Sequence, residues 1–281
     1  MMDTTRTQAL CQALGYDEEP FGFHYTDTPP PDALMAVPCV LPSRQDEMEQ
    51  RADWGAINKN FSCVLKYVWR ARVQGGAAAV SREQFGCLGG AFFLGFNKPQ
   101  LEGVVHYVST GIPGFMEGER YIDSPARCRE FFETVDPLPA TATHAVFKPL
   151  SQFGDDETPL VVQFFARPEV MSGLHQLAMF ITGDPHAVAS PFGAGCTNLV
   201  SWPLQFLAQG TPRAVLGGWD PSARPWFKPD ELSFTVPLAM FQTMLERWEQ
   251  SFLTTHAWKT VVKKIDKSRR AWGQGVRPGQ E

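Results

Sequence analysis

The sequence predicts an α/β (or α+β) fold made of two pseudo-symmetric halves, with a mixed sheet and flanking helices. Two observations predict it. A cysteine at the start of a helix, followed by a double glycine, occurs twice: Cys63 leads to Gly89-Gly90, and Cys196 leads to Gly217-Gly218. Strand-like segments also flank both copies in a similar order. We therefore expect two related halves that bring their cysteines and glycine turns to one place.

The predicted first half spans residues 20–140 and follows an N-terminal helix within residues 1–19. Alternation of apolar and polar residues predicts strands, and apolar residues at 3.6-residue spacing predict helices. In chain order, the predicted elements are a helix over Thr4–Gly15, strands over Pro20–Tyr25 and Met35–Val37, a polar loop or helix over Pro42–Asn60, an amphipathic helix over Phe61–Val73, an apolar run over Ala77–Val80, a glycine-rich turn over Cys87–Phe96, a strand over Gly103–Val108 and a helix over Ser124–Thr134.

The predicted second half spans residues 141–255 and is expected to form one compact unit with the first. Its elements are strands over Ala145–Leu150 and Leu160–Phe165, a helix over Pro168–Thr182, a helix from Asn198 or Trp202 to Gln209, strands over Ala214–Leu216 and Leu232–Val236, and a helix over Pro237–Thr254. By this alignment the strand over 104–108 corresponds to the strand over 232–236. Residues 256–281 are basic and lack a core face, so we expect a solvated, frayed C-terminal tail.

Composition limits the classes of function. The chain has 281 residues, of which 43% are hydrophobic and 12% aromatic, as in a soluble globular protein with a sizeable core. The net charge of −5 gives no bulk attraction to nucleic acid. No apolar stretch is long enough to span a bilayer, and the N-terminus lacks the apolar core of a signal peptide. We expect a cytoplasmic protein with a small-molecule partner, no nucleic-acid or membrane partner, and possible homo-oligomerisation.

The six cysteines predict thiols rather than disulfides. They are spread along a long chain without an export signal, and no two have the C-x-x-C spacing of zinc ribbons or redox motifs. They are Cys11, Cys39, Cys63, Cys87, Cys128 and Cys196.

The order and spacing of several motifs resemble a bacterial and archaeal family catalogued as domain of unknown function 169. The motifs are Cys63-Val-Leu-Lys66, Cys87-Leu-Gly-Gly90 through Gly95, Lys148-Pro-Leu150, Gly195-Cys196 and Phe234-Thr-Val-Pro-Leu238. The resemblance covers roughly residues 20–255 and implies no established activity. The family's recurrent cysteines correspond to Cys63, Cys87 and Cys196. Members often have a further cysteine in the region that corresponds to Leu216–Asp220, where this chain has no cysteine.

The leading hypothesis is one site between the halves, lined by Cys63, Cys87 and Cys196. Thiolates are the ligands that zinc and iron–sulfur clusters prefer, and adjacent glycines let the backbone approach closely. The site would hold a metal, an iron–sulfur cluster or a redox-linked small ligand. The sequence does not rank the six histidines as a fourth ligand, and His24 and His106 lie in strand-like runs, where a core or edge histidine is the simpler interpretation.

A second hypothesis is a binding module for a small anionic metabolite without a metal. Gly193 and Gly195 lie in a glycine-rich loop that enters a helix, where backbone N–H groups can hold phosphate or carboxylate. Gly89 and Gly90 could act likewise. Lys66 and Lys148 could add positive charge.

A third hypothesis is a thiol enzyme. Cys196 opens a predicted helix, whose dipole favours a thiolate, and Cys63 shares a helix face with Lys66 and Arg70. A thiol nucleophile usually needs an adjacent base, and none is visible locally. Whether the protein is an enzyme therefore stays open. A proline-rich loop between Trp219 and Trp226 could cap a pocket.

Overall fold

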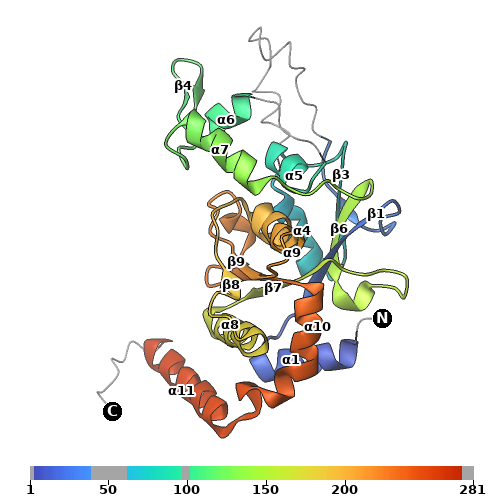
Figure 1. The fold of residues 1–281 in the computed structure, drawn as a ribbon, viewed down its shortest axis with the longest axis vertical. Helices are drawn as coiled ribbons and strands as arrows, with labels where there is room; N and C mark the ends of the chain where they lie inside the picture. Colours follow the sequence, from blue (N-terminus) through green and yellow to red (C-terminus); the bar gives the residue numbers. More distant parts are fainter. Residues whose placement is uncertain (1–2, 39–61, 97–101, 274–281) are drawn as a thin grey trace.

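An eight-stranded mixed sheet runs through the protein, which confirms the predicted α/β class (Figure 1). The computed structural model describes residues 3–38, 62–96 and 102–273. The order across the sheet is β2-β3-β6-β1-β7-β10-β9-β8. These strands are β1 (Phe21–Thr26), β2 (Leu34–Met35), β3 (Ala78–Ser81), β6 (His144–Pro149), β7 (Val161–Ala166), β8 (Val188–Ala189), β9 (Ala214–Gly217) and β10 (Leu232–Pro237).

The strand arrangement is the same from both edges of the sheet. The antiparallel pair β1–β7 lies at the centre, with Phe21 opposite Gln163. Going outward, β1 pairs antiparallel with β6 and β6 with β3, while β3 pairs parallel with β2. On the other side β10, β9 and β8 follow β7 with the same directions. Counted outward from this central pair, β6 lies on the side of β1, although the predicted division near residue 140 placed it in the second half.

Side chains alternate across the sheet and divide the core into two main layers. Val161 and Phe165 of β7 join the cluster on one face, whereas Val162 and Phe164 join the cluster on the other. This is the two-residue period of a strand that is buried on both faces. The nearly continuous apolar run over residues 160–165 is typical of such a strand, so the prediction of a strand here is confirmed.

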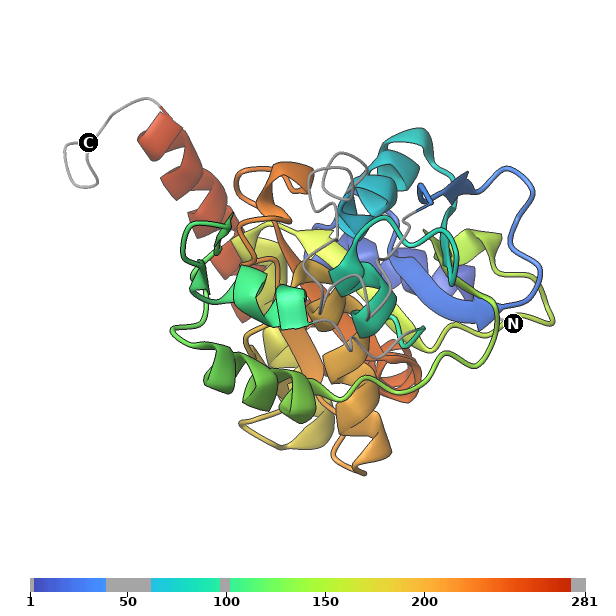
Figure 2. The same cartoon turned by 90° about the horizontal axis from the view of Figure 1, so that it is seen from above.

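Helices cover both faces of the sheet (Figures 1 and 2). One face carries α4 (Val64–Gln74), α5 (Leu88–Phe93), the π-helical turn η2 (Thr197–Ser201) and α9 (Trp202–Ala208), whose residues share a core cluster. The other face carries α1 (Thr4–Leu14), α8 (Pro168–Thr182) and α10 (Leu238–Arg247). The predicted helix over Phe61–Val73 corresponds to α4, while Phe61, Cys39 and the stretch 42–60 lie outside the described residues.

Two predicted elements between β3 and β6 are wrong. Residues 103–108 form helix α6 (Glu102–Val108) rather than a strand, and the predicted glycine-rich turn contains helix α5. A five- or six-residue apolar run fits either period, so spacing alone could not decide. The rest of this insertion is β4 (Gly111–Ile112), β5 (Met116–Glu117) and α7 (Pro125–Val135). By strand order the counterpart of β10 is thus β6, and both strands run into a Pro-Leu pair.

The C-terminal part also differs from expectation. The predicted helix over Pro237–Thr254 ends at Arg247 and continues as the 3₁₀ turns η4 (Trp248–Gln250) and η5 (Phe252–Thr254). The expected frayed tail contains an 18-residue helix, α11 (His256–Gly273), with no buried residue. Among the described residues, no helix combines the length and apolarity needed to cross a membrane.

A buried ion-pair network joins α4 to the segment that precedes β10. The guanidinium of Arg72 in α4 donates to both carboxylate oxygens of Glu231, at 3.0 and 2.6 Å, and to Glu18 at 2.7 Å. It also lies over the ring of Phe165, 4.1 Å from the centroid. Lys228 pairs with Glu18 from the solvent side. The network therefore links three segments that are far apart in the sequence.

Candidate functional site

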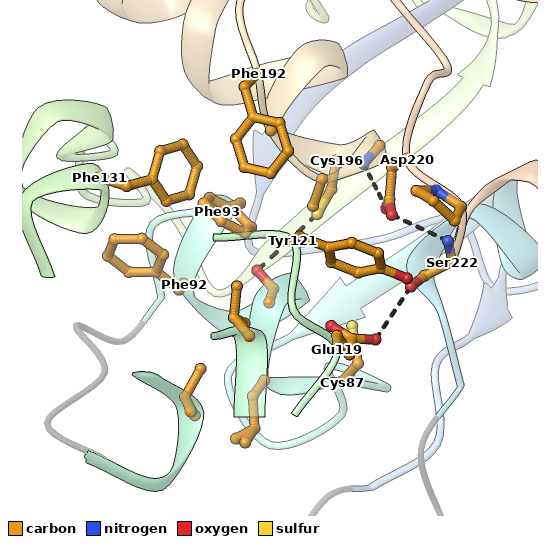
Figure 3. A pocket seen from close by; sticks show the side chains of 18 of the residues that line it. Cys87, Phe92, Phe93, Glu119, Tyr121, Phe131, Phe192, Cys196, Asp220 and Ser222 are labelled. Atoms are coloured by element: carbon orange, nitrogen blue, oxygen red, sulfur yellow. Dashed lines mark hydrogen bonds between the residues drawn. The ribbon is translucent and has the colours of Figure 1, made fainter. Parts of the chain in front are cut away.

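A pocket of about 510 Å³ lies beneath the insertion between β3 and β6 and is lined by residues from the ranges 63–132 and 190–222 (Figure 3). Its inner wall is made by the beginnings of α4, α5 and η2. Its outer wall is made by α6, β5, the segment that follows β5, and α7, with the loop after β9 at one side. The volume is within the range of pockets that hold small organic ligands.

The three cysteines singled out in the sequence all line this pocket. Each stands immediately before a helical segment: Cys63 before α4, Cys87 before α5 and Cys196 before η2. The Cys87 sulfur accepts a hydrogen bond from the Gly90 N–H at 3.2 Å, and the Cys196 thiol points to the Gly89 carbonyl at 3.9 Å. Segments far apart in sequence thus bring three sulfur atoms to one wall.

Burial keeps these thiols protonated. Loss of hydration raises the pKa of Cys63, Cys87 and Cys196, because a thiolate is less stable away from water. Each of Cys63 and Cys196 also has its pKa raised by the negative charge that nearby Cys87 would carry. The expected lowering of the Cys63 and Cys196 pKa values by helix ends and lysines is therefore outweighed by desolvation.

The described residues contain no group of three or more His, Cys, Asp or Glu side chains placed to hold a metal ion. The cysteines share a pocket, but they do not form an assembled ligand set. His24 and His106 are not in the pocket lining. The prediction of a three-cysteine metal or iron–sulfur site is therefore not supported by the geometry of the described ranges.

We expect iodoacetamide to alkylate the three pocket cysteines of the folded protein slowly, at about one tenth of the rate of free cysteine or less near neutral pH. Since only the thiolate reacts and the three pKa values are raised, each rate should keep rising as the pH passes the ordinary thiol pKa of about 8.5. Mass spectrometry of the digested protein measures this site by site, with denatured protein as the control. Fast, selective labelling of Cys196 at neutral pH would instead support a thiol enzyme.

The predicted anion-binding glycine loop is already occupied by a side chain of the protein. Gly193 and Gly195 line the pocket, but the Gly195 N–H donates to the Asp220 carboxylate at 3.1 Å. An added Cβ at Gly195 would lie 2.9 Å from side-chain atoms of Leu65 and Ala223. This glycine therefore permits close packing and a turn around Asp220, and its N–H is not aimed at an external anion.

Gly89 and Gly90 have different roles. Gly89 lines the pocket, and a Cβ there would meet only Phe93, at an ordinary 3.5 Å. Gly90 points away from it, and a Cβ would lie 2.6 Å from Val64 and 2.7 Å from the Phe85 carbonyl. The sequence singled out both as ligand-binding residues, but only Gly89 faces the pocket.

Neither predicted lysine reaches the pocket. Lys66 lies over the Trp226 ring, 5.7 Å from its centroid. Lys148 is 2% exposed, pairs with Glu157 and lies against Phe153, in a cluster with the buried His24. The described lining of the pocket does not support the prediction that these lysines supply positive charge to the site, because strand alternation and the helix phase turn both side chains elsewhere.

The polar groups that do reach the pocket include two carboxyls that the sequence did not single out, Glu119 and Asp220 (Figure 3). Ser222 links them, because its hydroxyl donates to Glu119 at 3.4 Å and its N–H donates to Asp220 at 3.0 Å. Desolvation raises the pKa of both carboxyls, and the charge of Asp220 raises that of Glu119 further. The proline-rich loop that begins after Trp219 contains Asp220, so its interpretation as a pocket cap was the sequence signal that could have pointed to this carboxyl. Glu119 had no such signal, because it follows residues 103–108, which were wrongly predicted to form a strand.

Aromatic side chains form most of the remaining wall. Phe131 of α7 packs edge-on against Phe192 of the loop before η2, with ring centroids 5.2 Å apart. Phe92 contacts Phe93 and Phe132 in the same wall, at 4.9 and 5.2 Å. Tyr107, Tyr121 and Trp219 also line the space. These rings come from separate segments of the chain, so the sequence could not show that they meet.

Comparison with protein families gives a match over most of the chain. The profile of the family DUF169, described as uncharacterised ArCR, matches residues 9–247. Neither the comparison with curated proteins nor the comparison with solved structures found a match. The matched range contains every described residue of the pocket lining and ends before α11.

Proposed function

The chain belongs to the DUF169 family, and we propose that its pocket binds a small organic molecule with an apolar body and no negative charge. The observation that carries the proposal is the composition of the lining. Among the described lining residues there is no lysine, arginine or histidine, and aromatic and aliphatic side chains predominate. Convergent polar groups in a mostly apolar pocket are typical of a small-ligand site.

The charge of the lining supports a neutral or cationic ligand over an anionic one. Glu119, Asp220 and the three thiols are all groups that can only become negative. An anion would be repelled by the carboxylates and would find no described cation in the lining, since Lys66 and Lys148 point elsewhere. An ammonium group would be attracted by both carboxylates and by the faces of the aromatic rings. We therefore do not favour the anionic-metabolite hypothesis.

Three probes with one body test the proposal: phenylbutylamine, phenylbutanol and phenylbutyrate. We expect the amine and the alcohol to bind, and the carboxylate to bind at least about tenfold more weakly in calorimetric titrations near neutral pH. As the pH is lowered, affinity for the amine should fall when Glu119 becomes protonated and loses its negative charge. Because burial raises the pKa of Glu119, this loss should occur at a higher pH than for an exposed glutamate. Glu119→Gln should weaken amine binding and leave alcohol binding unchanged.

A matched pair of tryptophan substitutions locates the binding. Ala194 lines the pocket, so Ala194→Trp should fill it and abolish binding of the amine and the alcohol. Leu207 is exposed on α9 outside the pocket, so Leu207→Trp should leave affinity unchanged. If phenylbutyrate bound more tightly than phenylbutylamine and phenylbutanol, the proposal would be contradicted. Stoichiometric iron or zinc in anaerobically purified protein, lost on Cys87→Ser, would favour the metal hypothesis instead.

We propose that this binding takes place in the cytoplasm. The described cysteines are free thiols, and a reducing compartment keeps thiols free. The proposal concerns binding and assigns no reaction.

A further inference from the structure

The C-terminal helix α11 has a charge opposite to that of the rest of the chain. Its residues 256–273 contain six basic side chains and one acidic one, a net charge of +5. The whole chain carries −5, so the other residues together carry −10. The helix also lies beyond the family match, which ends at residue 247. Its composition is thus a property of this chain in addition to the shared fold.

The side chains of α11 separate into two faces at 3.6 residues per turn. The apolar face carries Trp258, Val261, Val262, Ile265 and Trp272. The opposite face carries five of the six basic residues, which are Lys259, Lys263, Lys264, Lys267 and Arg270, while the sixth, Arg269, lies within the apolar face. A helix with a strongly basic face, an aromatic and β-branched face and a polar overall composition is typical of segments that lie in a membrane interface.

Much of the apolar face is free of protein contacts that would bury it. No residue of α11 is buried, and Val261, Val262 and Trp272 are exposed, the last to 70%. The helix is attached near its start, where Trp258 packs on Phe252 with ring centroids 4.9 Å apart. Further along, Arg269 donates to Glu169 of α8 at 2.9 Å. Both views show the later turns extending beyond the sheet and its covering helices (Figures 1 and 2).

We propose that α11 binds the surface of a bilayer that contains anionic lipids. The basic face would lie among the headgroups, and Val261, Val262 and Trp272 would enter the boundary between headgroups and acyl chains. These three side chains already face solvent, so their insertion requires no unfolding of the body. The expectation of no membrane partner came from the lack of an apolar stretch long enough to span a bilayer, and binding to a membrane surface does not need such a stretch. At physiological ionic strength charges act over only about 8 Å, so the local charge of α11 governs its contacts.

The exposed apolar face favours a membrane over a nucleic acid. A helix that binds a phosphate backbone needs basic side chains, but it gains nothing from solvent-exposed Trp and Val residues on its other side. A bilayer surface matches both faces at once, through hydrophobic burial and attraction to anionic headgroups.

The test is co-sedimentation of the full chain with sucrose-loaded vesicles. One set is phosphatidylcholine alone, and the other contains about 30% phosphatidylserine, a strongly anionic composition. We expect at least about tenfold stronger binding to the anionic vesicles, and loss of that preference at about 0.5 M salt, where the Debye length is short. Failure to bind the anionic vesicles at low salt, or equal binding to both sets, would overturn the proposal.

Two pairs of variants separate the faces of α11 from general effects. Trp272→Ala with Val261→Ser removes apolar contacts, and Lys263→Glu with Arg270→Glu reverses charge; each should weaken vesicle binding at least about fivefold. The matched controls are Phe115→Ala, at an exposed phenylalanine between β4 and β5, and Arg82→Glu with Arg127→Glu, at exposed arginines of the body. Controls should bind within about twofold of the parent protein.

All substituted side chains are solvent-exposed, so folding should survive, and circular dichroism verifies it. Equal loss of vesicle binding in variants and controls would contradict the role of α11. Retention on duplex RNA or formation of a dimer, lost in the α11 variants while vesicles do not bind, would assign the helix to those partners and overturn the membrane proposal.

Discussion

Replacing Glu231 by alanine is expected to lower the free energy of unfolding by about 3–5 kcal/mol, the usual effect of leaving a buried charge without its partner. The Arg72 and Glu231 side chains are 7% and 2% exposed and share two hydrogen bonds. Without Glu231, the guanidinium keeps only Glu18 as a charged partner among the described residues. Urea denaturation followed by circular dichroism measures the change through the midpoint at constant slope.

An exposed ion pair provides the control for this experiment. Arg129 and Glu102 form an equally short contact between α7 and α6, but both side chains are exposed. Solvent screens such pairs, so Glu102→Ala should change the free energy of unfolding by about 1 kcal/mol or less. If both substitutions had the same effect, burial would not be the source of the Arg72–Glu231 contribution. The difference between them measures how much burial adds to the cost of removing one partner of an ion pair.

The same substitution at two neighbouring glycines should have opposite consequences. Gly90→Ala is expected to lower the free energy of unfolding by about 2–3 kcal/mol, because overpacking of a core without free space strains it. The new Cβ would lie 2.6 Å from Val64 and 2.7 Å from the Phe85 carbonyl oxygen, a backbone atom that cannot rotate away. Gly89→Ala should be neutral or stabilise by up to about 1 kcal/mol through helix propensity.

Thermal and urea unfolding of the two variants measure this difference, and each serves as the control for the other. Gly90 fixes how closely α5 approaches the start of α4, so Gly90→Ala should also weaken binding of phenylbutylamine in the pocket. Similar destabilisation at both positions would mean that the helix tolerates no side chain there at all. A stable Gly90→Ala variant would show that the contact between α4 and α5 is looser than the structure has it.

Long elements with a clear period were predicted well. The helix over Pro168–Thr182 has its predicted bounds, since proline begins it and Gly183 ends it. The strand around Phe21 was predicted from alternation, and the strand around Val161 from a short apolar run. Turn residues next to each pattern are typical of a strand that ends there. One short apolar run was assigned wrongly: residues 103–108 form a helix that packs against α7 and lines the pocket, and no local pattern indicates those contacts.

The candidate site was predicted in part. The repeated cysteine–glycine pattern singled out three cysteines that do line one pocket, since each precedes a helix on the same face of the sheet. The positive charge predicted for the site is not found in the described lining of that pocket. Lys66 and Lys148 were chosen by composition near the motifs, but their direction depends on helix phase and strand register. Glu119 and Asp220, which are 101 positions apart, gave no joint signal in the sequence.

The sequence by itself determined the α/β class, the order of most strands and helices, and the helix-start positions of the three cysteines, because these depend on local periodicity, capping and turn residues. Only the tertiary structure decided which side chains share the pocket and whether its thiols are ionised. Those properties depend on burial and on distances between segments remote in sequence, where desolvation outweighs the local effects of helix ends and neighbouring lysines. Tertiary structure also decided that α11 projects with its apolar face exposed, because the exposure of a helix face depends on which other elements pack against it.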